Sequence, residues 1–136
     1  KKGDVVHIHF DMPVRTVVAN NNVKDDEGRV AVERGPIVYC AEAVDNQSEP
    51  VLRAVIGKQP AFDVVDNYKI DNTETKGAPA FAVKAITTQA QMLEDGANGV
   101  SVKNQKLTLI PYYAWNHRGA DQMNVWFVQS LKMLDK

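Results

Sequence analysis

Short apolar segments, separated every few residues by turn-forming residues, constrain this chain more than any other feature. Residues 37–41 are β-branched, aromatic and apolar at nearly every position, which is typical of a central strand covered on both faces. Residues 107–115 and 123–128 have the same character, and residues 29–33 alternate. Because Gly, Pro, Asn and Asp interrupt these segments and no long amphipathic helix fits between them, the pattern predicts an all-β fold. We expect an antiparallel β-sandwich, jelly-roll-like, with little or no helix.

In the segment at residues 4–14, apolar side chains from Val6 onward alternate with His7, His9, Asp11 and Pro13. A period of two places the apolar members on one face, as a half-buried strand requires. Such a strand with an open ladder is a template for strand addition, so we expect it to pair with another copy of the chain or with a rearranged segment of its own. The apolar members are Val6, Ile8, Phe10, Met12 and Val14.

The length of 136 residues suits a single domain over residues 1–136. Residues 45–105 are more polar and richer in turn signals than the rest, and they are a candidate for a looser subdomain or insertion. Within them, residues 51–56 and 81–86 are predicted as short strands, and residues 89–95 as one or two helical turns.

Composition and charge exclude several classes of partner. The chain has 16 basic and 17 acidic side chains, a formal net charge of −1 and no long basic run, which argues against nucleic acid and anionic membranes. No apolar run approaches the ~20 residues that span a bilayer. Cys40 is the only cysteine and cannot form an internal disulfide, so it does not indicate a redox compartment, and localisation stays open.

Four sets of residues suggest chemistry, each with a simpler alternative. His7 and His9 are two apart on a predicted strand and could share a metal, but only Asp11 continues their row, and a solvated strand face is the simpler interpretation. Cys40 lies in the strand with the strongest apolar character, which favours a buried, inert thiol over a nucleophile.

Two further sets are ambiguous in the same way. Glu33 and Glu42 could form a glycosidase carboxylate pair, although ion pairs at a strand end are the simpler interpretation. The rings of Tyr112, Tyr113 and Trp115 could stack on a sugar, although residues of this size more often fill a core.

Three stretches of the chain resemble the C-terminal region of glycoside hydrolase family 127, the β-L-arabinofuranosidase family and its close relatives. The first is GRVAVERGPIVYCAE at residues 28–42. The second is IPYYAWNHRG at residues 110–119, followed by MNVW at residues 123–126. The third is GDVV at residues 3–6, leading to DMPVR.

The resemblance implies an accessory role. Members of this family carry an (α/α) barrel that performs retaining hydrolysis with a cysteine nucleophile near zinc and a glutamate acid/base, followed by β-sandwich modules. None of those catalytic or zinc-binding residues maps onto this chain, so the resemblance implies no catalytic, cofactor or metal residue here. The implied partner is the barrel of the same parent chain, a glycoside hydrolase acting on L-arabinofuranosides or related plant-type glycans.

The leading hypothesis is therefore a non-catalytic β-sandwich that packs against a barrel and stabilises it. The chain opens with Lys-Lys-Gly-Asp and no Met, which is typical of an excised piece. Localisation stays unknown, and a periplasmic or secreted parent is one option left open. Trp115, His117 and Arg118 are the candidate contacts to the barrel or to carbohydrate. One alternative is a carbohydrate-binding module using exposed aromatic rings, and another is an enzyme in its own right. Solvent-facing rings would favour the binding module, and buried rings would favour the structural role.

Overall fold

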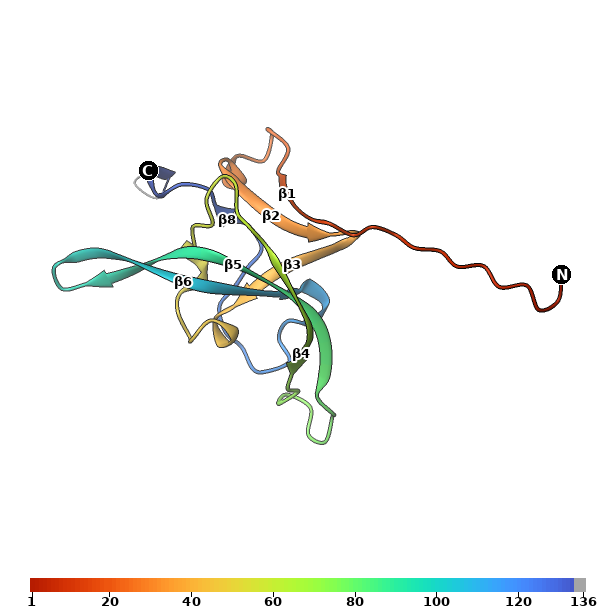
Figure 1. Ribbon diagram of the computed structural model, residues 1–136. Helices are drawn as coiled ribbons and strands as arrows, with labels where there is room; N and C mark the ends of the chain where they lie inside the picture. The colour runs from red at the N-terminus through yellow and green to blue at the C-terminus, as the bar shows by residue number, and fades with distance from the viewer. Residues whose placement is uncertain (134–136) are drawn as a thin grey trace.

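The computed structural model describes residues 1–133 and consists of strands joined by loops and short 3₁₀ turns (Figure 1). The strands are β1 (Val14–Val18), β2 (Arg29–Arg34), β3 (Ile37–Glu42), β4 (Asp63–Ile70), β5 (Phe81–Gly96), β6 (Gly99–Pro111), β7 (Met123–Asn124) and β8 (Phe127–Val128). The 3₁₀ turns are η1 (Lys24–Asp26), η2 (Ala43–Asp45), η3 (Val51–Arg53), η4 (Tyr112–Ala114) and η5 (Leu131–Met133).

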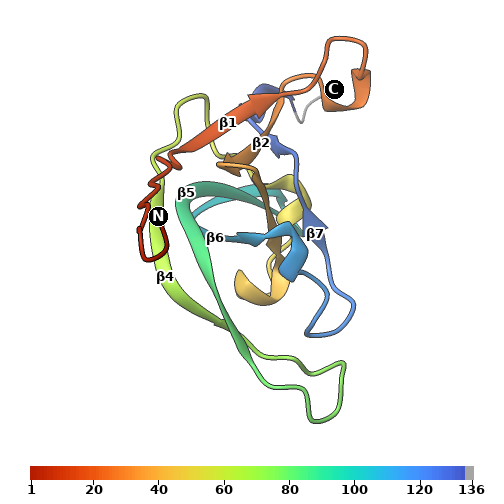
Figure 2. The same ribbon diagram turned by 90° about the vertical axis from the view of Figure 1, so that its right-hand side faces the viewer.

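The strands hydrogen-bond in the order β1-β2-β3-β6-β5-β4, while β7 pairs with β3 and β8 with β2. All these pairings are antiparallel. The sheet curves strongly, with β4 and β5 on one side and β7 on the other (Figure 2). The prediction of an all-β antiparallel sandwich with little helix is confirmed.

Strand β3 lies at the centre of this arrangement, as its composition predicts. It pairs with β2, β6 and β7, and Tyr39, Cys40 and Ala41 are completely buried. Gly35 closes the β2–β3 hairpin with a φ of 58°, a conformation that glycine adopts without the steric cost of a side chain.

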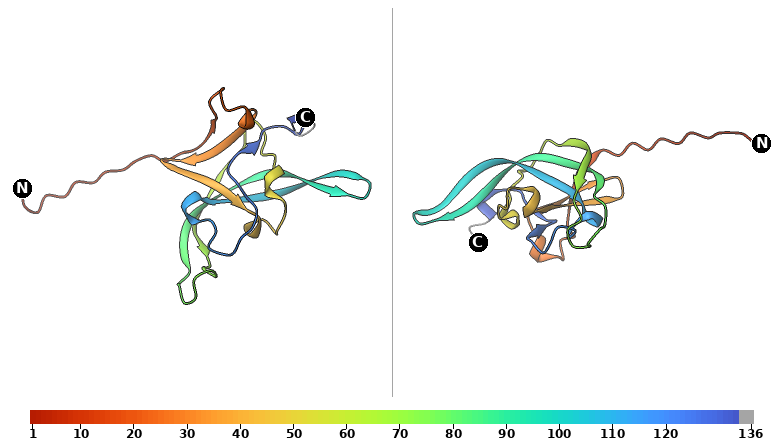
Figure 3. Two further views of the ribbon diagram at one scale, coloured as in Figure 1. Left: turned by 180° about the vertical axis from the view of Figure 1, so that it is seen from behind. Right: turned by 90° about the horizontal axis from the view of Figure 1, so that it is seen from below.

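Strands β5 and β6 form one long hairpin whose register runs without a break from Ile86↔Leu109 to Gly96↔Gly99. The predicted helical turns at residues 89–95 are wrong, because each of these residues pairs with a residue of β6. Cross-strand pairing along this length overrides the weak local preference for a helix. The tip of the hairpin protrudes beyond the remainder of the domain (Figure 3).

The two larger of the three core clusters among residues 1–133 lie against the sheet. The main core is built from β2, β3, β5, β6, β8 and η3, and the second core lies where β3, β4, β5 and η4 meet. Val14, Ile37 and Phe62 pack against the main core from its edge. The buried members of the main core are Val30, Val32, Tyr39, Ala41, Ala43, Val51, Ala54, Ile56, Ile86, Ala90, Met92, Leu107, Leu109 and Phe127. Those of the second core are Cys40, Ile70, Val83, Ile110 and Ala114.

The prediction of a strand from residue 4 is wrong. Residues 1–13 form no strand and extend away from the domain, and β1 begins only at Val14 (Figure 1). Val14 pairs with Arg34, and β2 ends there because the chain reverses at Gly35 and Pro36. The residues before Val14 therefore have no neighbouring strand within this domain.

Three smaller predictions also need correction. Residues 51–56 contain a 3₁₀ turn and two isolated bridges at Val55, to Gln91 and Val128, in place of a strand. The strand predicted for 107–115 ends at Pro111, and that for 123–128 is interrupted between β7 and β8. Tyr39 is fully buried, and Trp126, which lies between β7 and β8, is half-buried.

Candidate functional site

The polar centre of the domain is a cluster of Arg118, Glu42, Asp45 and Tyr68, which we call the Arg118 cluster. Glu42 is the last residue of β3, Asp45 ends η2, Tyr68 comes from β4, and Arg118 lies in the loop between η4 and β7. Arg118 Nη2 donates to Glu42 Oε2 at 2.6 Å and to Asp45 Oδ2 at 2.6 Å, and Nη1 donates to Asp45 Oδ1 at 2.5 Å. The guanidinium therefore bridges two carboxylates, one of them bidentately.

Two further donors complete the carboxylate environment. The Tyr68 hydroxyl donates to Asp45 Oδ1 at 2.6 Å, and the Asn116 backbone N–H donates to Glu42 Oε1 at 2.8 Å. The side chains of Arg118, Glu42 and Asp45 are only 11%, 3% and 1% exposed. Both carboxylates are thus committed to partners inside the protein.

Electrostatics keep the cluster charged and closed. Burial by itself disfavours the Arg118 guanidinium, but hydrogen bonds and charges from Asp45 and Glu42 outweigh burial and raise the pKa of Arg118 above its ordinary value. Burial, reinforced by the hydrogen bond to Asp45, raises the pKa of Tyr68 to about 12. At neutral pH Arg118 and Tyr68 therefore keep their protons.

Cys40 lies next to the Arg118 cluster in the second core and is an inert thiol. Burial, followed by the nearby charges of Glu42 and Asp45, raises the pKa of Cys40 to about 12. Because the thiolate is the reactive form, a thiol with this pKa is not a nucleophile at neutral pH.

The three residues singled out as contacts lie together but differ in their surroundings. Arg118 points inward, and Trp115 is half-buried against the second core. The ring of His117 meets that of Phe81 edge-on, with 5.0 Å between centroids. The His117 carbonyl accepts from the N–H of Thr73 at 2.8 Å, which joins this loop to the connection between β4 and β5. None of these observations identifies an external partner for the three residues.

The aromatic residues of η4 are the exposed part of this region. Tyr113 is 65% and Tyr112 is 45% exposed, so the expectation that these two rings fill the core is wrong. They lie outside because η4 ends the buried run of β6 and turns the chain outward at Pro111. Tyr112 tilts against Trp115 with ring centroids 6.2 Å apart, which fixes its position.

The other candidate groups are not brought together. His7 and His9 lie on the exposed residues before β1, where His9 Nε2 is 3.2 Å from Asp11 Oδ1. Among residues 1–133, no three His, Cys, Asp or Glu side chains gather as metal ligands. Glu33 accepts from Arg15 Nη2 at 2.9 Å across the β1–β2 pair, so Glu33 and Glu42 have different partners.

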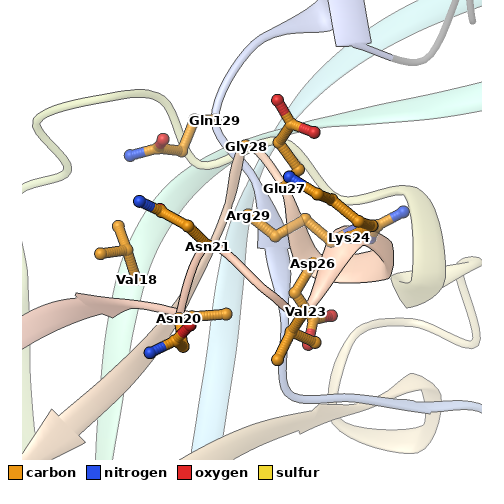
Figure 4. A pocket seen from close by; sticks show the side chains of 11 residues that line it. Val18, Asn20, Asn21, Val23, Lys24, Asp26, Glu27, Gly28, Arg29 and Gln129 are labelled. Carbon is orange, nitrogen blue, oxygen red and sulfur yellow. The ribbon is translucent and has the colours of Figure 1, made fainter.

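A pocket opens under the loop between β1 and β2 (Figure 4). Its labelled polar side chains spread around the opening and do not converge on one point. Arg29 also donates from Nη1 to the Trp126 carbonyl at 3.2 Å. We therefore assign no chemistry to this pocket, which is lined by Val18, Ala19, Asn20, Asn21, Val23, Lys24, Asp26, Glu27, Gly28, Arg29 and Gln129.

The sequence indicated Arg118 but not its partners. Asp45 lies 73 positions from Arg118, and Tyr68 lies 23 positions from Asp45, so no local spacing links these residues. The one available signal was the short distance from Glu42 to Asp45 at the end of a buried strand, which predicts two carboxylates near one another. Their cation could be identified only from the fold.

The comparisons with known proteins agree with this geometry. The sequence pattern of the glycoside hydrolase family 127 C-terminal domain matches residues 14–128. The non-reducing end β-L-arabinofuranosidase of Bifidobacterium longum subsp. longum is 33% identical over 129 residues, covering 91% of this chain and 20% of the relative.

Solved structures give the same result. A GH127 β-arabinofuranosidase aligns with a TM-score of 0.76 at 44% identity, covering 91% of this chain and 18% of that chain. The GH127 β-L-arabinofuranosidase Ara127N-Se from Geobacillus stearothermophilus T6 aligns with a TM-score of 0.70 at 28% identity, covering 88% and 18%.

Fold and cluster together define an antiparallel β domain whose charged centre is internal. The chain belongs to glycoside hydrolase family 127, and the part of the family that it matches is the C-terminal domain. It spans about a fifth of the length of the relatives that it matches. Within the described residues, no helix is long and apolar enough to cross a membrane.

Proposed function

We propose that this domain is a non-catalytic part of a family 127 glycosidase, where it packs against an (α/α) catalytic barrel and stabilises it. The observation that carries the proposal is the closed Arg118 cluster. Its two carboxylates, Glu42 and Asp45, are buried next to Cys40. Arg118, Tyr68 and the Asn116 N–H hold them. A glycosidase needs two carboxylates that reach the scissile bond. These two are used to hold the η4–β7 loop against β3.

The zinc chemistry of the family does not fit this chain. A zinc site takes three or four side-chain ligands. The one cysteine is buried beside Glu42 and Asp45, but Arg118 already occupies both carboxylates. We therefore assign zinc binding to another part of the enzyme and derive no step through it.

The surface around η4 is the proposed contact with the barrel. Exposed aromatic rings on a rigid support are the usual anchors of protein interfaces. Tyr112 and Tyr113 are such rings, and the support is the loop that Arg118 and His117 tie to β3 and to Thr73. The half-buried Trp115 extends the same surface inward.

A carbohydrate-binding role has one observation in its favour. Tyr113 borders an open groove that also contains Asp66, Asn67 and Lys84, a mixture of ring face and polar groups that suits a sugar. However, Lys84 Nζ already donates to Asp66 Oδ1 at 2.5 Å, so two of these polar groups are paired. The observations favour protein contact, and sugar binding becomes an outcome of the test.

The test compares a longer family 127 enzyme carrying this domain with the same enzyme ending before residue 14. We expect the shortened enzyme to have a lower thermal unfolding midpoint or a shorter half-life at the assay temperature. In the longer enzyme, Tyr113→Glu should lower the midpoint, whereas the matched Val23→Glu, at another exposed apolar position, should not. Unchanged stability in both the shortened enzyme and Tyr113→Glu would overturn the proposal. Retention of the isolated domain on an arabinose-containing polysaccharide, lost in Tyr113→Ala, would establish sugar binding instead.

A further inference from the structure

Residues 4–13, which we call the arm, have the pattern of a half-buried strand but contact almost nothing in this domain. Val6, Ile8 and Phe10 are 80%, 71% and 75% exposed. The arm runs outward from the domain (Figure 1). Three large apolar side chains in one alternating row, all facing solvent, are costly for an isolated chain and mark a surface that is covered elsewhere.

The row continues the core-facing row of the domain. Val14, the first residue of β1, packs against the main core, and Met12 is half-buried with its side chain over Gly35. Phe10 and Ile8 share the parity of these two residues, so an extended chain presents them on the same side. The apolar row becomes exposed where β2 ends at the Gly35 reversal and no longer pairs with the chain. The sequence pattern itself does not change at this point.

The position of the arm indicates what covers it. The family 127 C-terminal domain matches residues 14–128 and leaves the arm outside. The relatives are about five times longer than this chain, so they contain polypeptide beyond this domain. The arm joins β1 without a linker, and its partner must therefore lie against this domain. A partner in the same polypeptide has the highest effective concentration.

We infer that the arm is a strand that completes a β-sheet in the preceding part of the longer family 127 chain, with Val6, Ile8, Phe10 and Met12 facing the core of that sheet. Main-chain hydrogen bonds from the arm supply the pairing, and the alternating apolar side chains set its register. This inference rests on the proposed function, because it requires the rest of the enzyme to be present. It makes the arm the covalent and structural joint between two modules.

The test measures hydrogen exchange of amides 5–13 in the isolated domain and in the longer enzyme. In the isolated domain we expect exchange at the rate of an unstructured peptide. In the longer enzyme we expect protection on the order of 100-fold or more, because strand amides open only with the sheet. Ile8→Asp should abolish this protection, since it places a charge in the core row, while the matched His7→Asp, on the opposite face, should retain it. In the isolated domain neither variant should move the unfolding midpoint.

Each outcome separates the inference from the proposed function. Free exchange of the arm in the longer enzyme overturns the inference, even if removal of residues 14–128 lowers enzyme stability and so upholds the proposed function. Protection of the arm with no effect of that removal upholds the inference and overturns the stabilising role. Protection in the isolated domain that rises with concentration, together with a dimer in light scattering, would show a second copy as the partner and would also overturn the inference.

Discussion

Arg118 illustrates how much one residue depends on partners that are distant in the sequence. Its position in a loop of polar residues is typical of a surface contact, yet its guanidinium is buried between Glu42 and Asp45. The loop closes over the end of β3 because two buried carboxylates there need a cation and hydrogen-bond donors. The surface residues of the same loop are then free to contact other proteins.

We predict that Arg118→Met destabilises the domain by about 3–5 kcal/mol, because two carboxylates remain buried without their cation. The control is Arg15→Met, which removes the exposed ion pair to Glu33 and should cost less than about 1 kcal/mol. Urea denaturation of both variants measures the difference. Equal losses would show that the Arg118 cluster contributes no more than a surface pair.

The buried thiol of Cys40 should make the domain less stable at alkaline pH. Its folded pKa of about 12 lies above the ordinary thiol value of 9.0, so the folded state keeps a proton that the unfolded state releases. The contribution is present below pH 9.0 and is lost as pH rises toward about 12. From pH 9 upward we expect the free energy of unfolding to fall by about 1.4 kcal/mol per pH unit from this group. Cys40→Ala should show a slope smaller by that amount; identical slopes would contradict the burial of the thiol.

Tyr39 is the largest fully buried side chain of the central strand, and its hydroxyl donates to the Lys84 carbonyl at 3.0 Å. Tyr39→Ala should destabilise the domain by about 3–5 kcal/mol, as truncation of large core aromatics does. Tyr39→Phe keeps the ring and should cost about 1 kcal/mol, the value of the hydrogen bond. An unchanged denaturant midpoint in Tyr39→Ala would rule out this placement.

The β5–β6 hairpin shows how an element can combine two roles. Near the domain, its residues fill the main core, whereas toward the tip both strands become exposed. Met92 is fully buried, while Val102, one position beyond the partner of Met92 on β6, is 49% exposed. Pairing holds the register along the whole hairpin, but only the proximal half contributes burial.

Paired alanine substitutions should reveal this division. Met92→Ala should cost about 2–5 kcal/mol because it leaves a cavity in the main core. Val102→Ala should cost about 0.5 kcal/mol or less because its side chain is solvated. Chemical denaturation gives both values, and hydrogen exchange should be faster at residues 96–103 than at residues 86–92. Similar losses in the two variants would show that the tip is packed in solution.

For the whole molecule, the distribution of charged and apolar groups supports the proposed non-catalytic role. The most buried carboxylates belong to the Arg118 cluster, and the single thiol is shut inside the second core. Exposed apolar and aromatic side chains include those of η4 and of the arm. This distribution suits attachment to another module.

We predict that the isolated chain does not hydrolyse an aryl β-L-arabinofuranoside, with or without added zinc. The physical reason is that no carboxylate of the Arg118 cluster is free to reach a glycosidic bond, and Cys40 remains a thiol at neutral pH. Release of the aryl alcohol is measured against a buffer blank. Zinc-dependent turnover above the blank would contradict the assignment of catalysis to another part of the enzyme.

The sequence by itself determined the all-β class, the central position of β3 and the family. These features depend on local composition and on contiguous motifs. A strand that buries both faces needs a run of apolar residues, and such a run can be read directly from the sequence. Tertiary structure decided the rest. Residues 89–95 became a strand because β6 lies beside them, and the arm stayed unpaired because β2 reverses at Gly35. Arg118 turned inward because the fold brings Glu42 and Asp45 beneath its loop. Hydrogen-bond and charge partners are set by proximity in space, and no local pattern along the chain records that proximity.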